Sequence, residues 1–356
     1  MNIKHQICVL AMFAGTTNFA MASESLIDVS TSKLQWTGVA VSRTGRIFVN
    51  YPRWSNHVSN SVCELLKDGS VIAYPNSELN KWDGSSPDKH FVCVQAVFID
   101  ANDYLWIVDA ASPEFKGVVA GGAKLVKVNL KSNKVERTYA MTSDVAPAAS
   151  YLNDVRIDTK GQHAFLTDSG LGAIVVVDLK TGNAVRRLAN HSSTKAENIH
   201  ITINKKEFGK QPDGTYKKVN SDGLALDPSH QYLYYQALTG KTLYRVPIKA
   251  LLDSKMNEND LGQKVEKVAQ TFPSDGIEFG STGKLYLTSL EDNSVKSIDV
   301  RSKKPAEIVV RDFRLIWPDS LSNGPNGSIF VTASQINLGP NPSTPYRLFK
   351  FKTPNK

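Results

Sequence analysis

Six polar residues recur along this chain, each directly before or at the start of an apolar, β-like run. They stand 44 to 69 positions apart and are, in order, Thr37, Gln95, Asn153, Asp222, Asp275 and Asp319. Carboxylates and amide carbonyls are the ligands that Ca²⁺ and Mg²⁺ prefer, whereas Zn²⁺ favours the Cys and His side chains missing from this set. Carboxylates also exchange protons with substrates. These residue types therefore suit cation binding or proton transfer, provided that the fold brings them together.

Each of the six residues opens a similar stretch of sequence. Two runs rich in Val, Ile, Leu, Tyr and Phe flank a turn such as Thr44-Gly45 or Asn326-Gly327, which predicts a β-hairpin. Further strand-like runs lie between the hairpins, for example Lys124–Asn129 with 135–140. About four strands per unit and six units predict an all-β fold, a six-bladed β-propeller of four-stranded antiparallel blades.

The two ends of the chain also carry strand-like runs, residues 26–34 and Tyr346–Lys352, outside the six hairpins. We expect one to complete the blade that the other end begins, because this closes the ring and leaves no edge strand exposed. The one helix expected is 248–254, in an insertion.

In a propeller the innermost strands line a central channel, so the six leading residues are expected around one mouth. The second strand of each hairpin returns to the same end, so its last residue is expected there too. These last residues are Asn50, Asp109, Asp168, Gln236 and Ser289. Arg53 and Trp54, just after the first hairpin, are placed to cover the mouth, with packing as the alternative for Trp54.

Three carboxylates near one axis repel each other and cannot all stay ionised without compensation. We predict one divalent cation, Ca²⁺ or Mg²⁺, held by Asn153, Asp222 and Asp275, and no organic cofactor. The alternatives stay open: Asp-Gly before a strand is also ordinary turn chemistry, the carboxylates could cap backbone N–H groups, and water could fill the channel.

The first residues read as a secretory signal peptide. Lys4 precedes an apolar run at 7–15, and Ala20-Met21-Ala22 has the pattern of a cleavage site, so we expect the cut after Ala22. The apolar run is too short for the roughly 20 residues that span a bilayer. We therefore expect 23–356 to form a single propeller domain, secreted or periplasmic, with no membrane segment after cleavage.

Two cysteines, Cys63 and Cys93, remain after this cut. In an oxidising compartment an even pair favours a disulfide, with two free buried thiols as the alternative.

The net charge of +8 does not indicate a nucleic-acid partner. The densest run of lysines, between Lys205 and Lys218, is interrupted by Glu207 and Asp213 and lacks a row of stacking aromatic residues. We interpret it as a solvated loop face and expect a monomer that binds a small molecule.

The chain resembles the major royal jelly/Yellow protein family, including its bacterial members, from about residue 36 to 336. The resemblance is carried by Leu152-Asn153-Asp154-Val155, Ser221-Asp222-Gly223-Leu224, Thr242-Leu243-Tyr244-Arg245-Val246-Pro247 and Trp317-Pro318-Asp319-Ser320-Leu321. It implies a secreted six-bladed propeller. Some insect members are linked to dopachrome conversion in melanin formation, and others look like nutritional or amine-binding proteins.

The sequence is similar, more distantly, to the gluconolactonase/senescence-marker propellers. Those hold a divalent metal at the channel mouth, and Asn153, Asp222 and Asp275 match that site by blade position. The resemblance also implies a Glu ligand from the first blade, where this chain has Thr37.

Three functions follow from these features. The first is a Yellow-type binding protein or tautomerase-like isomerase that holds a small aromatic or cationic ligand. Its expected catalytic residues are Asp222 and Asn153, and its expected ligand contacts are Thr37, Gln95, Asp109, Asp168, Gln236, Asp319 and Arg53. The second is a lactone hydrolase in which the metal polarises a carbonyl and Asp222 handles a proton or water. The third is a protein-binding scaffold.

Overall fold

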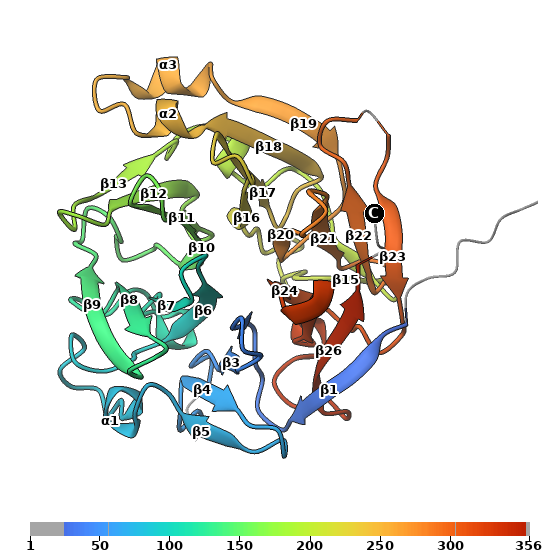
Figure 1. Ribbon diagram of the computed structural model, residues 1–356. Helices are drawn as coiled ribbons and strands as arrows, with labels where there is room; N and C mark the ends of the chain where they lie inside the picture. Colours follow the sequence, from blue (N-terminus) through green and yellow to red (C-terminus); the bar gives the residue numbers. More distant parts are fainter. Residues whose placement is uncertain (1–24, 56, 303, 354–356) are drawn as a thin grey trace, which may run out of the picture.

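Six four-stranded antiparallel sheets are arranged as blades around one axis in the computed structural model, which describes residues 25–55, 57–302 and 304–353 (Figure 1). The six-bladed propeller predicted from the repeat is thereby confirmed. The predicted signal peptide, with its cut after Ala22, lies outside the described residues.

The first five blades follow the chain from the inner strand to the outer one. Blade one comprises β2 (Val39–Val41), β3 (Ile47–Asn50), β4 (Val62–Leu65) and β5 (Val71–Ala73). Blade two comprises β6 (Val94–Ile99), β7 (Tyr104–Asp109), β8 (Lys124–Asn129) and β9 (Lys134–Ala140). Blade three comprises β10 (Leu152–Asp158), β11 (His163–Asp168), β12 (Ala173–Asp178) and β13 (Ala184–Arg187). Blade four comprises β16 (Ser221–Leu226), β17 (Tyr232–Ala237), β18 (Thr242–Pro247) and β19 (Glu266–Gln270). Blade five comprises β20 (Ile277–Phe279), β21 (Leu285–Ser289), β22 (Ser294–Ile298) and β23 (Glu307–Arg311).

The sixth blade joins both ends of the chain, as predicted. It comprises β24 (Pro318–Asn323), β25 (Ser328–Ala333), β26 (Tyr346–Lys352) and β1 (Ile27–Ser32). Strand β1 pairs antiparallel with β26, and Ser32 lies opposite Tyr346. Near the axis the Thr332 hydroxyl donates a 2.5 Å hydrogen bond to the Thr37 carbonyl, which links the last blade to the first.

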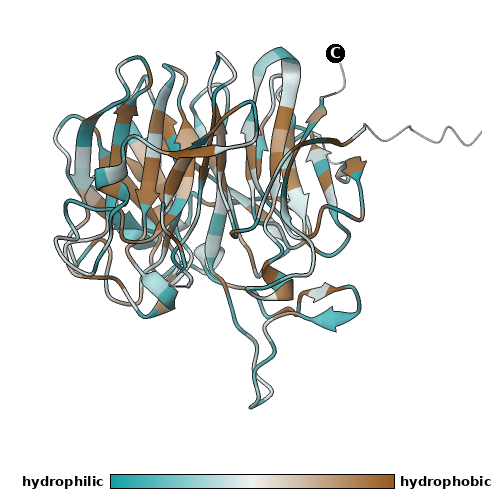
Figure 2. Ribbon diagram, turned by 90° about the horizontal axis from the view of Figure 1, so that it is seen from below, coloured by the Kyte–Doolittle hydropathy of each residue, from teal (hydrophilic) through white to brown (hydrophobic). Residues whose placement is uncertain are grey.

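The hydrophobic core lies between neighbouring blades. Trp106, Phe165 and Phe349 are among the largest fully buried side chains, and the apolar colour follows the strands inside the blades (Figure 2). Each such burial contributes about 1.5–3 kcal/mol. Outer strands such as β5 and β9 are largely exposed, because they form the outer edges of their blades, away from the axis.

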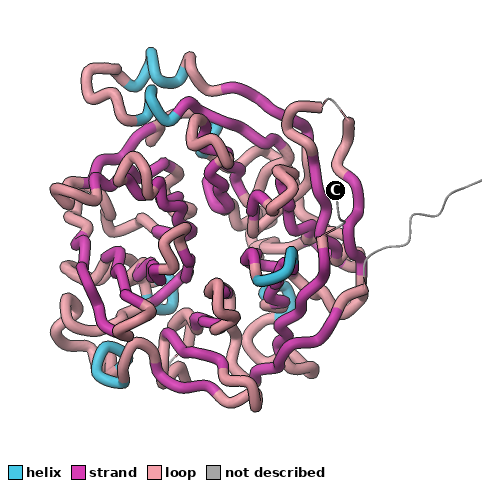
Figure 3. Tube along the Cα trace, in the orientation of Figure 1, coloured by secondary structure: helices cyan, strands magenta, loops and turns pink. Residues whose placement is uncertain are grey.

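Short helices lie outside this β framework (Figure 3). The helix expected at 248–254 is the shorter α2 (Ile248–Leu251). Two further helices, α1 (Ser77–Asn80) and α3 (Glu258–Gly262), were not expected, because they are too short to show a helical period. No helix in the described part of the chain is long and apolar enough to cross a membrane.

An insertion between blades three and four forms a small hairpin, β14 (Thr202–Ile203) and β15 (Lys206–Glu207). Its apolar residues pack onto loops of blades four, five and six. The shared cluster contains Ile201, Ile203, Phe208, Val219, Leu238, Leu290 and Trp317. The insertion is therefore anchored to one end of the propeller.

Candidate functional site

A cavity of about 250 Å³ opens at the end of the propeller that carries the insertion. Five of the six leading residues line it: Gln95, Asn153, Asp222, Asp275 and Asp319. All five are buried, between 2% and 8% exposed, so they form the deep end of the cavity. We call these five residues the polar ring.

Glycines after two ring aspartates let the inner strands converge. A Cβ on Gly223 would lie 2.2 Å from the Asp275 carbonyl oxygen, and one on Gly276 would lie 2.2 Å from that of Asp319. Only glycine tolerates such a close approach of the neighbouring backbone. The Asp-Gly pairs, which the sequence left open as turn chemistry, therefore act by bringing neighbouring blades together at the axis.

A chain of hydrogen bonds runs around the ring. The Tyr151 hydroxyl donates to Gln95 Oε1 at 2.9 Å, and Gln95 Nε2 lies 3.4 Å from Asn153 Oδ1. Asn153 Nδ2 donates to Asp222 Oδ2 at 2.9 Å. Outside the ring, Trp54 Nε1 donates to the Tyr151 hydroxyl at 2.7 Å. The cavity wall and the nearest carboxylate are thus connected through neutral side chains.

The three ring aspartates share one acidic environment, and none forms an ion pair within the described residues. Burial, followed by the neighbouring charges of Asp275 and Asp319, raises the pKa of Asp222 well above its usual range. Burial and the charge of Asp275 do the same to the pKa of Asp319. The pKa of Asp275 is raised to about 6, mainly by burial, with opposition from hydrogen bonds of Trp317 and Asp222. The cluster therefore retains protons near neutral pH.

Below the ring, Arg156 crosses the axis of the propeller. This β10 residue forms ion pairs with Asp154 at 2.8 Å and with Glu278 of β20 at 3.1 Å, although blade four separates the two strands. Its guanidinium also lies 4.9 Å from the ring centroid of Phe98 in blade two. Burial raises the pKa of Glu278 to about 7. These contacts place a buried ionic cluster in the centre of the propeller, beneath the cavity.

Aromatic side chains form much of the cavity wall. The ring of Phe115 stacks against those of Trp54 and Tyr151, with both centroid distances 5.2 Å and both interplanar angles 28°. Phe208 packs against Trp317 with their centroids 4.6 Å apart. The ring of Phe115 is half exposed, which leaves an aromatic surface for a ligand.

Two of these aromatic residues have an unfavourable backbone conformation. Phe115 has φ 57° and Trp317 has φ 54°, in the left-handed region that bulky side chains rarely adopt. Each costs of the order of 1–3 kcal/mol, and such strain gathers at ligand-binding sites. Holding both rings in these positions therefore lowers the stability of the fold.

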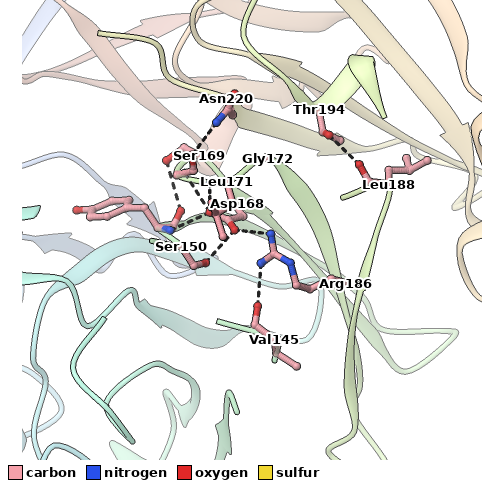
Figure 4. A network of polar contacts seen from close by, with 12 residues as sticks. Val145, Ser150, Asp168, Ser169, Leu171, Gly172, Arg186, Leu188, Thr194 and Asn220 are labelled. Atoms are coloured by element: carbon pink, nitrogen blue, oxygen red, sulfur yellow. Dashed lines mark hydrogen bonds and ion pairs between the residues drawn. The ribbon is translucent and has the colours of Figure 1, made fainter. Parts of the chain in front are cut away.

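The predicted contacts Asp109 and Asp168 do not line the cavity, which corrects the expectation that second-strand ends reach the mouth. Both are fully buried. Asp168 accepts hydrogen bonds from Ser150 Oγ and the Tyr151 N–H and pairs with Arg186 at 2.7 Å (Figure 4). Asp109 pairs with Lys124 at 2.8 Å. These strand ends turn into the blade, where loop N–H groups and a buried cation require an acceptor.

Gln236, Thr37 and Arg53 are also absent from the cavity lining. Gln236 Nε2 donates to the Phe272 carbonyl at 2.7 Å, and Thr37 Oγ1 donates to the Gln95 carbonyl at 3.0 Å. Arg53 is buried and donates to the Asn80 carbonyl at 3.0 Å, so it secures a loop instead of covering the mouth. Its neighbour Trp54 lines the cavity.

The predicted disulfide is not formed, because Cys63 and Cys93 are both free and buried. Cys63 packs in a cluster with Trp36 and Tyr51, whereas Cys93 lies before β6 with its N–H bonded to Asp109. Burial raises the pKa of each thiol to about 12, so both behave as small apolar side chains.

The arrangement of Asn153, Asp222 and Asp275 does not fit a ready-made cation site. Asp222 and Asp275 accept hydrogen bonds from Asn153 Nδ2 and Trp317 Nε1, and the Asn153 oxygen faces Gln95. Within the described residues no three His, Cys, Asp or Glu side chains are grouped to hold a metal ion. A protein donor already serves one oxygen of each of these aspartates, and the cation stays a prediction.

Several residues that line the cavity were not predicted from the sequence. Tyr151 and Trp317 each stand two positions before a ring residue, so a search of the positions flanking the repeat would have found them. Lys217 and Lys218 belong to the run that we interpreted as a solvated face, yet both line the cavity. Nothing in the local sequence indicates that the insertion folds back over the mouth.

Comparison with known proteins places this architecture among its relatives. The family model described as major royal jelly protein matches residues 92–352. Major royal jelly protein 5 of Apis mellifera is 23% identical over 266 residues, which cover 69% of this chain and 41% of that protein. The chain thus spans less than half the length of this curated relative.

Solved structures share the fold at low identity. A gluconolactonase from Xanthomonas campestris has a TM-score of 0.57 at 12% identity, over 95% of this chain and 94% of that one. Regucalcin, a calcium-binding protein from Agrobacterium tumefaciens str. C58, has a TM-score of 0.53 at 13% identity, over 92% and 93% of the two chains. At these identities the similarity establishes the propeller and nothing about the ligand.

Proposed function

This chain belongs to the major royal jelly protein family, and from that premise we propose that it binds a small aromatic cation in the mouth of its propeller. One observation carries the proposal: a single cavity is lined by three buried aspartates and five aromatic side chains. The aromatic residues are Trp54, Phe115, Tyr151, Phe208 and Trp317. Carboxylates attract an ammonium group, and aromatic faces stack on a ring and also attract cations.

The size of the cavity supports a ligand of one or two rings. Its volume of about 250 Å³ lies just below the roughly 300–1,000 Å³ of sites for drug-sized molecules. Arg156 and its ion-pair partners occupy the centre of the propeller beneath the ring. A ligand therefore enters from the mouth, beside Phe115 and the insertion. A ligand that enters there meets the aromatic side chains first and the aspartates at the deep end.

A second candidate activity, tautomerisation, has its own supporting observation. Moving a proton between two atoms of a ligand requires one group that accepts it and another that donates it. Asp275, with its pKa of about 6, suits the acceptor, and Asp222, whose pKa burial raises well above its usual range, suits the donor. Asn153 donates to Asp222 and would orient its carboxyl group. A lactone hydrolase would need a bound divalent cation, which the hydrogen bonds of the ring do not favour.

Binding is tested by calorimetry with phenethylamine and tryptamine, each beside an uncharged analogue of the same ring system. We expect the amines to bind and the neutral analogues to bind at least about tenfold more weakly, because only the amines complement the aspartates. Asp275→Asn should weaken amine binding, because the pKa of Asp275, about 6, leaves this ring aspartate ionised at neutral pH. Lys206→Gln, an exposed change on β15 outside the cavity, should leave it unchanged. Equal binding of amines and neutral analogues would contradict the proposal.

Tautomerisation is tested separately by following the decay of dopachrome with the purified protein. Asp275→Asn should abolish any enzymatic acceleration, and Asp222→Asn, which leaves the ionised Asp275 in place, should do so while the amines still bind. An unaltered rate in Asp275→Asn and Asp222→Asn would remove both residues from catalysis and leave a binding protein.

A further inference from the structure

The charge of the cavity changes sign between its deep end and the insertion. The cationic residues among its lining are Lys217 and Lys218, both from the segment before β16, whereas its acids are the three ring aspartates. The ammonium of Lys217 lies 4.3 Å from the centroid of the Phe115 ring. Within the described residues this ammonium has neither an ion pair nor a hydrogen bond, and desolvation by the surrounding residues lowers the pKa of Lys217. The cavity is therefore bipolar, with an aromatic surface beside its cationic end.

Lys217 is held in place from both sides along the chain. Its N–H donates to the Gly209 carbonyl at 2.8 Å, and a Cβ on Gly209 would lie 3.0 Å from the Cβ of Lys217. Beyond these contacts, Phe208 packs on Trp317, and the Val219 N–H donates to Thr239 Oγ1 at 3.0 Å. The packed insertion therefore fixes the backbone of Lys217, and the exposed side chain extends from there to the ring of Phe115.

This distribution of charge constrains the ligand at both of its ends. A ligand ammonium next to Lys217 would be repelled, so it belongs with the aspartates. The other end of such a ligand then faces an ammonium that no protein acceptor satisfies. A carboxylate supplies the missing partner, because a hydrogen bond between opposite charges is about twice as strong as a neutral one.

We propose that the ligand is an aromatic zwitterion, an amino acid or a compound with the same ring, ammonium and carboxylate, and that Lys217 determines this specificity. The inference rests on the proposed function, because it assumes that the ring aspartates receive the ligand ammonium. It goes further by separating amino acids from the amines that lack a carboxylate.

Two matched pairs of ligands test this inference: phenylalanine with phenethylamine, and tryptophan with tryptamine. Calorimetry gives the ratio of the Kd of the amine to the Kd of the amino acid, which reports the contribution of the carboxylate alone. In Lys217→Gln this ratio should fall at least about tenfold, mostly through weaker binding of the amino acid. Lys217→Arg should retain most of the wild-type ratio, because it preserves the charge.

Lys206→Gln is the control, since it removes one exposed lysine of the same insertion outside the cavity and should leave the ratio unchanged. Thermal melts of all three variants check that they fold like the wild type. An equal ratio in wild type and Lys217→Gln would overturn the role of Lys217 while the binding function survives. If neither member of a pair binds, the proposed function itself fails, and this inference fails with it.

Discussion

Trp317 Nε1 donates a 2.7 Å hydrogen bond to Asp275 Oδ2, from the residue before β24 to the residue two before β20. The bond joins blade six to blade five at the mouth of the cavity. It is made by an indole held at φ 54°, so its geometry comes with backbone strain. One side chain thus serves both as aromatic wall and as the donor that opposes the effect of burial on the pKa of Asp275.

Replacing this donor should raise the pKa of Asp275. Trp317→Phe keeps an aromatic face but removes the bond that stabilises the ionised carboxylate, so burial then acts with less opposition. Ligand binding that depends on the ionised aspartate should require a higher pH than in wild type. The measurement is the Kd of tryptamine from pH 5 to 8.

Trp54→Phe is the matched control for that substitution. It removes an indole donor from the same cavity, but this donor serves the neutral Tyr151 hydroxyl. The midpoint of its pH profile should therefore stay at the wild-type value. A shift of equal size in both variants would show that the Trp317 bond does not tune Asp275.

Asp275 should also make the folded protein less stable as the pH rises. Its folded pKa of about 6 lies above the ordinary value of 3.8, so the folded state binds more protons between these values. The free energy of unfolding therefore falls as the pH rises from about 4 to 6 and loses nothing further to this group above its folded pKa. Urea unfolding at pH 4, 5, 6 and 7 should show a shallower decline for Asp275→Asn than for wild type.

Asp312 should have the opposite effect on how the free energy of unfolding depends on pH. A side-chain hydrogen bond from Arg314, opposed by burial, lowers the pKa of Asp312 below its usual range. Its contribution is present at neutral pH and is lost as the pH falls through the folded pKa. Asp312→Asn should therefore be less stable than wild type at pH 7 and approach wild type in acid.

For Asp275→Asn, a decline in the free energy of unfolding as steep as in wild type would argue against a raised pKa of Asp275.

Two lysines on β8 should contribute very differently to the free energy of unfolding. Lys124 is 3% exposed and pairs with the fully buried Asp109, whereas Lys127 pairs with Glu136 at the surface. Lys124→Met leaves a buried carboxylate without its cation and should lower the free energy of unfolding by roughly 3–5 kcal/mol. Lys127→Met should lower it by less than about 1 kcal/mol. Urea unfolding of both variants measures the difference, and similar losses would refute the structural role assigned to Asp109.

Phe115 should show a conflict between stability and binding. At φ 57° glycine is unstrained, whereas alanine keeps the strain of an L-residue in the left-handed region. Both Phe115→Gly and Phe115→Ala remove the ring and should weaken ligand binding to a similar degree. The glycine variant should nevertheless be more stable than the alanine variant, by about 1 kcal/mol in urea unfolding. If alanine proved the more stable variant, the strain at this position would be discounted.

The repeat in the sequence was sufficient to predict the blades and five of the residues at the deep end of the cavity. Strand alternation and turn residues are local signals, and a propeller places equivalent positions of each repeat around one axis. Gln95, Asn153 and Asp222 were found this way, because a rule that holds for one blade holds for its neighbours.

The same reasoning failed where the orientation of a side chain or a long-range contact decided its role. Asp109 and Asp168 end strands at the correct end of the propeller, but loop N–H groups and the cations of Lys124 and Arg186 hold them inside the blades. The insertion carries Lys217 to Phe115, a neighbour far away in the sequence, through packing on Trp317. The sequence by itself determined the ring, because symmetry follows from a repeat. Only the tertiary structure decided the aromatic wall and the cationic end, because they arise from contacts between parts of the chain that differ from blade to blade.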